Sequence, residues 1–138
     1  MLDRSIKFEN LKEMMKNSEE KFGDEVAFYR DGKGLEDSKK VTYKEFCYEI
    51  NSLGTALIEM GLKGKRIAVI GENRYEWELS YLAVVTGTGT IVPLDKALPE
   101  NEIESLIIRS EVEAIIYSEK YDECMAKIQK QGNTKLKY

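Results

Sequence analysis

The segment RIAVIG, residues 66–71, decides the fold prediction because it is apolar almost without alternation. A strand with one solvated face alternates apolar and polar residues, whereas a central parallel strand is covered on both faces and lacks that alternation. We therefore predict that residues 66–71 form the buried central strand of a parallel sheet.

After residue 71, helical and strand-like patterns alternate along the chain. The predicted elements are, in order, a helix capped by Asn73 and running through Trp77, Tyr81 and Val84, a strand over residues 90–92 closed by Pro93, a helix with Pro99 in its first turn, a strand over residues 112–118, and a helix capped by Ser118 and ended by Gly132. Helices between successive strands imply right-handed crossovers and a largely parallel sheet.

The residues before this region predict a helix and a hairpin. Apolar side chains at helical spacing indicate a helix over residues 10–21, with Asn10 as its N-cap and Gly23 after its end. Two strand-like runs, residues 26–30 and 39–43, flank a loop that begins with Asp-Gly, which favours a β-hairpin.

The strongest helix signal lies between the hairpin and the central strand. Thr42 and Glu45 have the spacing of a capping box, and Gly61 occupies the position of a left-handed residue after the helix. One apolar face is expected to contain Phe46, Ile50, Leu53, Leu57 and Met60. The predicted fold is therefore α/β, a largely parallel sheet with flanking helices plus an N-terminal β-hairpin, in one domain over residues 1–138.

The composition excludes several classes of function. The formal net charge is −4 and basic residues are interspersed with acidic ones, so no face for nucleic acid is predicted. The sequence has no histidine, which excludes a Ser-His-Asp triad and the usual zinc sites from this chain. No apolar run is long enough for a transmembrane segment, and residues 1–16 lack a signal-peptide core, so a cytoplasmic location is expected.

The run TGTGT, residues 86–90, has the composition of a phosphate-binding loop but the wrong position for one. Such loops follow a strand and precede a helix, because the positive end of the helix faces the anion. Residues 86–90 instead follow a predicted helix and lead into a strand. We expect these glycines to end the helix and to let the chain pass close to the sheet.

Three blocks of sequence carry a family resemblance: VTYKEF (41–46), GLKGKRIAVIGENRYEW (61–77) and LAVVTGTGTIVPLD (82–95), followed by LPENEIESLI (98–107). Their order and spacing resemble the N-terminal segment of the adenylate-forming enzymes. Within that superfamily the chain is most similar to the acyl-CoA synthetases, including those that act on long-chain fatty acids. The resemblance extends from about residue 10 to the last residue.

The resemblance implies a parent enzyme that activates a carboxylate with ATP and then transfers the acyl group to CoA, with Mg²⁺ as the metal. The family's phosphate loop ending in Pro-Lys, its later nucleotide motifs and its catalytic lysine have no counterpart here. We therefore expect a piece cut before the active site, with the remainder of the parent enzyme as its partner. No catalytic, cofactor-binding or metal-binding residue is assigned to this chain.

Residues that match the family blocks also have structural explanations. Asn73 is explained as an N-cap, Glu76 as its capping-box partner and Trp77 as a packing residue. Asp95 has two interpretations: it belongs to a loop near the parent's substrate channel, or it caps a turn. The turn-capping role is favoured.

Acidic and thiol side chains receive structural interpretations as well. Glu100, Glu102 and Glu104 are interpreted as a solvated face near a helix N-terminus rather than as metal ligands. Cys47 and Cys124 fall in predicted helices, which favours packed, reduced thiols over a disulfide.

A second functional class stays open at this point: a small α/β regulatory module that binds a ligand or a protein. Its specific form, a phosphorelay receiver, requires an acidic pair after the first strand and an aspartate at the end of the third. The first strand is followed only by Glu72, and AIIYS ends in Ser118. The ligase interpretation is therefore preferred.

The last residues, TKLKY (134–138), are predicted to begin another strand. An unpaired strand exposes backbone donors and acceptors that can pair with another chain. Self-association into a homodimer through this segment is therefore expected.

Overall fold

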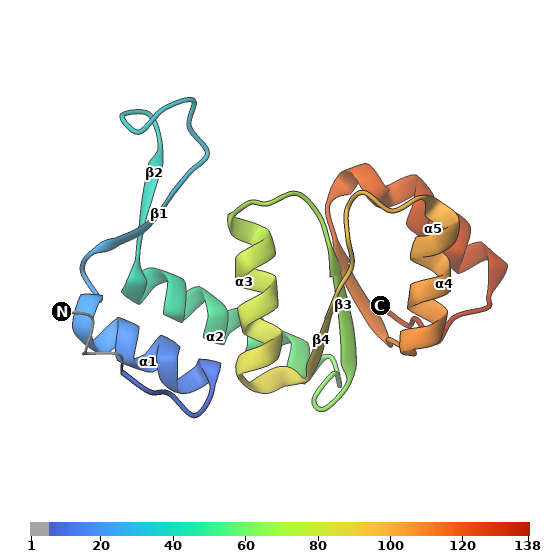
Figure 1. Cartoon of the computed structure of the whole chain (residues 1–138), viewed down its shortest axis with the longest axis horizontal. Helices are drawn as coiled ribbons and strands as arrows, with labels where there is room; N and C mark the ends of the chain where they lie inside the picture. The colour runs from blue at the N-terminus through green and yellow to red at the C-terminus, as the bar shows by residue number, and fades with distance from the viewer. Residues whose placement is uncertain (1–5) are drawn as a thin grey trace. The chain divides into compact units, whose positions relative to one another are not determined.

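The computed structural model describes residues 6–138. These residues belong to two compact units, one that ends at Glu49 and one from Ile50 to Tyr138 (Figure 1). The prediction that no signal peptide is present rests partly on residues 1–5, which lie outside the described residues.

The first unit begins with helix α1, Leu11–Phe22. Its N-cap is Asn10, whose side-chain oxygen accepts a hydrogen bond from the Glu13 amide at 2.9 Å, and its C-cap is Gly23. The predicted start and end of this helix are confirmed. No residue of α1 is buried, so the helix contributes little to a core.

Strands β1 (Val26–Arg30) and β2 (Lys39–Thr42) form the predicted antiparallel hairpin. The pairing register shifts between Val26 and Phe28, which marks a β-bulge. The ring of Phe28 packs edge-on against Phe46 at a centroid distance of 4.7 Å. This aromatic contact joins the hairpin to the first turns of the next helix.

Helix α2, Tyr43–Glu59, starts with the predicted capping box. The Thr42 amide donates to Glu45 Oε2 at 2.8 Å, and the Glu45 amide donates to Thr42 Oγ1 at 3.2 Å. These hydrogen bonds lower the pKa of Glu45. The two reciprocal bonds satisfy backbone donors that would otherwise have no partner at the start of the helix.

The apolar face of α2 is confirmed except at its end. Phe46, Ile50 and Leu57 are buried and Leu53 is half-buried, but Met60 is 44% exposed. The prediction for Met60 is wrong because α2 ends at Glu59, so residue 60 no longer follows the helical face. Gly61 follows with φ of 85°, the left-handed conformation expected for this position.

The second unit contains a parallel sheet of three strands in the order β4–β3–β5. The strands are β3 (Arg66–Ile70), β4 (Thr90–Pro93) and β5 (Ala114–Tyr117). Strand β3 pairs with both neighbours, and its residues 67–70 are at most 2% exposed. The prediction of a buried central strand is confirmed.

Helices cover both faces of this sheet (Figure 1). They are α3 (Tyr75–Ala83), which continues as a π-helical turn over Val84–Thr88, then α4 (Glu100–Ser110), a 3₁₀ turn (Glu119–Tyr121) and α5 (Asp122–Gln131). Ala68 and Ile70 of β3 pack in a cluster with residues of α4 and α5, whereas Ile67 packs in a second cluster with Leu57 and Val84. Each face of β3 thus belongs to a different part of the core.

Two of the predicted helix starts are displaced by one or a few residues. Pro99 is the N-cap of α4 and does not lie inside its first turn. Ser118 precedes the 3₁₀ turn, makes no capping hydrogen bond, and is followed by Tyr121 as the N-cap of α5. The intervening 3₁₀ turn uses a backbone bond, from the Tyr121 amide to the Ser118 carbonyl at 2.9 Å, where a side-chain cap was predicted. Gly132 ends α5 as predicted, with φ of 70°.

Residues 134–138 lie along the outer edge of β5. The Lys137 amide donates to the Glu113 carbonyl at 2.8 Å, and the Ile115 amide donates to the Tyr138 carbonyl at 3.1 Å. Lys135 and Lys137 pair with Glu111 and Glu113 at 2.7 and 3.1 Å. The segment is not a regular strand, but it occupies the β5 edge of its own chain.

Candidate functional site

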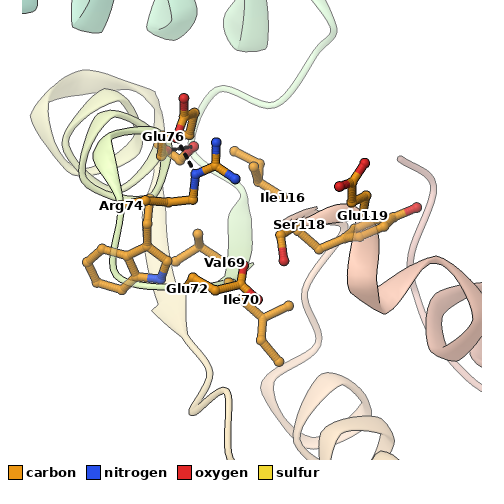
Figure 2. A pocket seen from close by; sticks show the side chains of 12 residues that line it. Val69, Ile70, Glu72, Arg74, Glu76, Ile116, Ser118 and Glu119 are labelled. Carbon is orange, nitrogen blue, oxygen red and sulfur yellow. Dashed lines mark hydrogen bonds and ion pairs between the residues drawn. The ribbon is translucent and has the colours of Figure 1, made fainter. Parts of the chain in front are cut away.

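A crevice opens at the carboxyl ends of β3 and β5, inside the second unit. It has a volume of about 340 Å³. Its lining comes from the end of β3 and the turn after it, the first half of α3, and the end of β5, and consists of Val69, Ile70, Gly71, Glu72, Arg74, Glu76, Trp77, Ser80, Ile116, Tyr117, Ser118 and Glu119 (Figure 2).

The topology of the sheet explains why a crevice forms here. After β3 the chain enters α3 on one face of the sheet, whereas after β5 it enters the 3₁₀ turn and α5 on the other face. Neighbouring parallel strands whose connections leave toward opposite faces separate at their carboxyl ends, and ligands of α/β proteins bind at such points. The crevice is therefore the candidate functional site.

Two ion pairs involve residues that line the crevice. Arg74 Nε contacts Glu76 Oε2 at 2.7 Å, and Figure 2 shows the guanidinium extending from α3 toward Ile116. Lys120 Nζ contacts Glu72 Oε1 at 2.7 Å and lies 5.0 Å from the centre of the Tyr121 ring. The second pair connects the turn after β3 to the turn after β5.

The Lys120 ammonium is the main reason that the pKa of Glu72 falls to about 2, with the Ser118 hydroxyl as the next contribution. A lowered carboxyl pKa stabilises the fold above the ordinary pKa of 4.5, and that contribution is lost as the pH falls through about 2. Glu72 is therefore a carboxylate, and a hydrogen-bond acceptor only, at neutral pH.

Ser118 and Trp77 are the other notable side chains of the crevice. Ser118 Oγ is buried and makes no hydrogen bond of good geometry among the described residues, although it is near enough to Glu72 to affect the pKa of that carboxyl. The Trp77 indole stacks on the Tyr81 ring, with the centroids 5.4 Å apart and the planes at 18°. This stacking fixes the indole beside the apolar floor of the crevice.

The structure corrects the predicted role of Asn73. Helix α3 begins one residue later than predicted, at Tyr75, with Arg74 as an N-cap that makes no side-chain capping bond. Asn73 is therefore outside the helix, and Arg74 Nε donates a hydrogen bond to Glu76 Oε2 at 2.7 Å.

The run of residues 86–90 has the structural role that its position predicts. Thr88 Oγ1 is buried and donates to the Ala83 carbonyl at 2.9 Å, so it does not face a ligand. Gly89 lies against the backbone of Lys65, and a Cβ atom at this position would collide with the Lys65 carbonyl oxygen. The glycine is needed for close approach to the sheet.

The acidic residues of α4 do not gather around one point. Glu100 pairs with Lys127 at 2.9 Å, Glu102 is exposed, and Glu104 is half-buried rather than solvated and lies beside the Gln131 amide. Among residues 6–138, no group of three or more histidine, cysteine, aspartate or glutamate side chains is arranged to hold a metal ion.

Asp95 and the cysteines also have structural roles. Asp95 Oδ1 accepts a hydrogen bond from the Ala97 amide at 2.9 Å, which confirms the turn-capping interpretation. Cys47 and Cys124 are buried and free, and burial raises the pKa of both thiols. A raised pKa disfavours the reactive thiolate, as expected for packed cysteines.

Sequence reasoning missed the crevice because it treated Glu72 and Ser118 separately. The usable signal was that both follow predicted parallel strands, Glu72 just after β3 and Ser118 just after β5. Carboxyl ends of neighbouring parallel strands lie on the same edge of a sheet. The pairing of Glu72 with Lys120 depends on side-chain positions that strand prediction does not supply.

The model of the AMP-binding enzyme family matches residues 15–137. The chain belongs to the AMP-binding enzyme family. The predicted family resemblance is confirmed by this match.

Individual relatives agree with this family assignment. Fatty acyl-CoA synthetase A of Dictyostelium discoideum is 37% identical over 81 residues, which cover 58% of this chain and 12% of that protein. Surfactin synthase subunit 2 of Bacillus subtilis (strain 168) is 31% identical over 86 residues, which cover 62% of this chain and 2% of that protein. The chain thus spans a small part of the length of these relatives.

Solved structures share the fold. The anthranilate CoA ligase AuaEII, solved with anthranoyl-AMP, matches 99% of this chain and 25% of its own with a TM-score of 0.81 and 17% identity. The N-terminal domain of FACL13 from Mycobacterium tuberculosis matches 94% of this chain and 33% of its own with a TM-score of 0.82 and 17% identity. The α/β fold of an AMP-binding N-terminal domain is therefore confirmed.

The side chains present do not fit the phosphate groups of the ATP and CoA that are implied for the parent enzyme. The hydroxyl of Thr88 already bonds to the protein backbone, and the crevice presents three carboxylates, Glu72, Glu76 and Glu119, to any phosphate. Arg74 and Lys120 pair with two of these carboxylates, and the remaining acidic excess disfavours a phosphate or pyrophosphate group.

Within the described part of the chain, no helix is long and apolar enough to cross a membrane.

The close approach of Gly89 to Lys65 generates a stability prediction. Gly89→Ala should lower the free energy of unfolding by about 1–3 kcal/mol, because the added methyl group meets a backbone carbonyl that cannot move aside easily. Gly87→Ala is the matched control, since Gly87 is exposed and has open space around its Cβ position. Urea unfolding of both variants measures the difference; equal stabilities would contradict the packing assigned to Gly89.

Proposed function

We propose that this chain is the N-terminal structural part of an ATP-dependent acid–CoA ligase. In the parent reaction a carboxylate attacks the α-phosphate of ATP, which gives an acyl-adenylate and releases pyrophosphate. The CoA thiol then attacks the acyl carbonyl, and AMP leaves. The family match over residues 15–137 is the observation that carries this proposal.

A fatty acid is proposed as the carboxylate substrate of the parent enzyme. The support is the 37% identity to a protein named fatty acyl-CoA synthetase A, over 58% of this chain. The named acid of another structural neighbour is anthranilate, at 17% identity, a level that carries fold information only. Neither relative indicates the chain length of the acid.

In the parent, this chain supplies a framework and the remaining residues of the enzyme supply the chemistry. The buried strand β3 and the helices on both faces of the sheet form the rigid part of this framework. We propose that the chain itself binds no ATP or CoA, in keeping with the poor fit of Thr88 and the acidic crevice, and no Mg²⁺, in keeping with the lack of a metal-holding acidic group among residues 6–138. Its partner is then the remainder of the parent enzyme, and a cytoplasmic location stays a prediction.

The isolated chain should be catalytically inactive, because no preorganised group faces the charge that develops on the α-phosphate during adenylation. Pyrophosphate release is measured with the 138-residue chain, ATP, Mg²⁺ and a panel of fatty acids, with a complete acyl-CoA synthetase as the positive control. We expect background release from the chain for every acid. Acid-dependent turnover above background would refute the framework role.

A chimera tests the ligase assignment itself. Residues 15–137 would replace the aligned segment of a complete fatty acyl-CoA synthetase, and the same pyrophosphate assay would be used. Acid-dependent release by the folded chimera supports the proposal. A folded chimera that binds ATP but never releases pyrophosphate counts against it.

We also infer that the isolated chain forms a homodimer, but through β4 rather than through residues 134–138. Those residues already bond to Glu113 and Ile115 of their own chain, whereas β4 is the other edge strand of the three-stranded sheet. An open strand edge favours pairing with a second copy.

Light scattering coupled to size exclusion tests the dimer over a wide range of protein concentration. We expect the mass to rise to that of a dimer, and the dimer to persist when residues 134–138 are deleted. A monomer mass at all concentrations, or a dimer that depends on residues 134–138, would contradict the inference.

A further inference from the structure

The polar groups of the crevice differ in what they require from a ligand. Glu72, Glu76 and Glu119 line the crevice as carboxylates, which only accept hydrogen bonds, whereas the Arg74 guanidinium only donates them. Ser118 offers a hydroxyl, which does both. Two of the carboxylates are already paired, Glu76 with Arg74 and Glu72 with Lys120, so the site is close to neutral with a small acidic excess.

We propose that the crevice binds a neutral polyhydroxylated ring of about monosaccharide size, such as a sugar or a cyclitol. Ligand hydroxyls donate to carboxylates and accept from a guanidinium, so one chemical class satisfies both kinds of group without adding charge. An anionic ligand would face Glu72, Glu76 and Glu119. A cationic ligand would lie beside the Arg74 guanidinium, which already pairs with Glu76, and would add like charge next to it.

The Ser118 hydroxyl supports a ligand that forms hydrogen bonds. Its oxygen is buried without a partner of good geometry among the described residues, and such groups are rare in folded proteins. Figure 2 shows this oxygen directed toward Glu72 and Ile70, at the centre of the lining residues. A ligand hydroxyl in the crevice can bond to Ser118 and to the Glu72 carboxylate together.

The apolar part of the crevice matches the C–H face of a ring. Val69, Ile70 and Ile116 line it together with Trp77, whose indole is held by stacking on Tyr81. The volume of about 340 Å³ lies near the lower end of the range for small-molecule sites, which limits the ligand to one ring or two. The inference does not depend on the proposed ligase function, because that function assigns no chemistry to these residues.

The chain contains one tryptophan, Trp77, so intrinsic tryptophan fluorescence reports on the crevice directly. The 138-residue chain is titrated with glucose and with myo-inositol, and separately with benzoate and with benzylamine at constant ionic strength. We expect a saturable change with at least one polyol, with Kd of about 1 mM for a ligand of this size. Benzoate and benzylamine should give no saturable change.

Ser118→Ala should weaken polyol binding by roughly three- to tenfold, the loss expected for one hydrogen bond. Ser110→Ala is the matched control, because Ser110 lies on α4, its hydroxyl bonds to the Leu106 carbonyl at 2.6 Å, and it does not line the crevice. This control should bind like the unchanged chain. Circular dichroism and urea unfolding establish that both variants are folded.

Amide NMR shifts on the unchanged chain give a second measurement that requires no variant. Polyol addition should perturb residues 69–80 and 116–119, which contain the crevice lining. The proposal is overturned by the absence of saturable polyol binding across the millimolar range, by equal or tighter binding of benzoate or benzylamine, by perturbations confined to other residues, or by equal losses for Ser118→Ala and Ser110→Ala.

Discussion

Burial of strand β3 on both faces is the constraint on which the second unit depends. Residues 67–70 are at most 2% exposed. Ala68 and Ile70 pack in a cluster with residues of α4 and α5, whereas Ile67 packs in a cluster with Leu57 and Val84. Burial of apolar surface of this extent stabilises a fold by about 25 cal/mol for each Å². Because both faces are covered, the connections of the sheet have to leave toward both sides.

That requirement also creates the candidate site. The chain leaves β3 toward one face and β5 toward the other, so the carboxyl ends of the two strands separate and a crevice remains between them. The side chains that follow the two strands, Glu72 and Ser118, then lie opposite one another. Lys120, in the turn after β5, forms an ion pair with Glu72 at 2.7 Å. The crevice is thus a consequence of the topology, while its chemistry comes from a few residues in the turns.

Patterns that depend on burial or on local backbone bonds were predictable from sequence, as RIAVIG, the Thr42–Glu45 capping box and Gly61 demonstrate. The position of the TGTGT run between a helix and a strand also predicted its close passage along the sheet, because that argument depends only on element order. The exact start of helix α3 and the side-chain ion pairs were not predicted. Asn73 was predicted as an N-cap, but Arg74 occupies that position, and the ion pair of Glu72 with Lys120 has no signature in the spacing of residues.

Hydrogen–deuterium exchange of individual backbone amides is the most direct test of the central role of β3. If this strand is the structural centre of its unit, the amides of Ile67–Ile70 exchange only through global unfolding and are the slowest in the chain. The amides of α1, which has no buried residue, should exchange much faster. Exchange of β3 amides at rates like those of α1 would contradict this account of the fold.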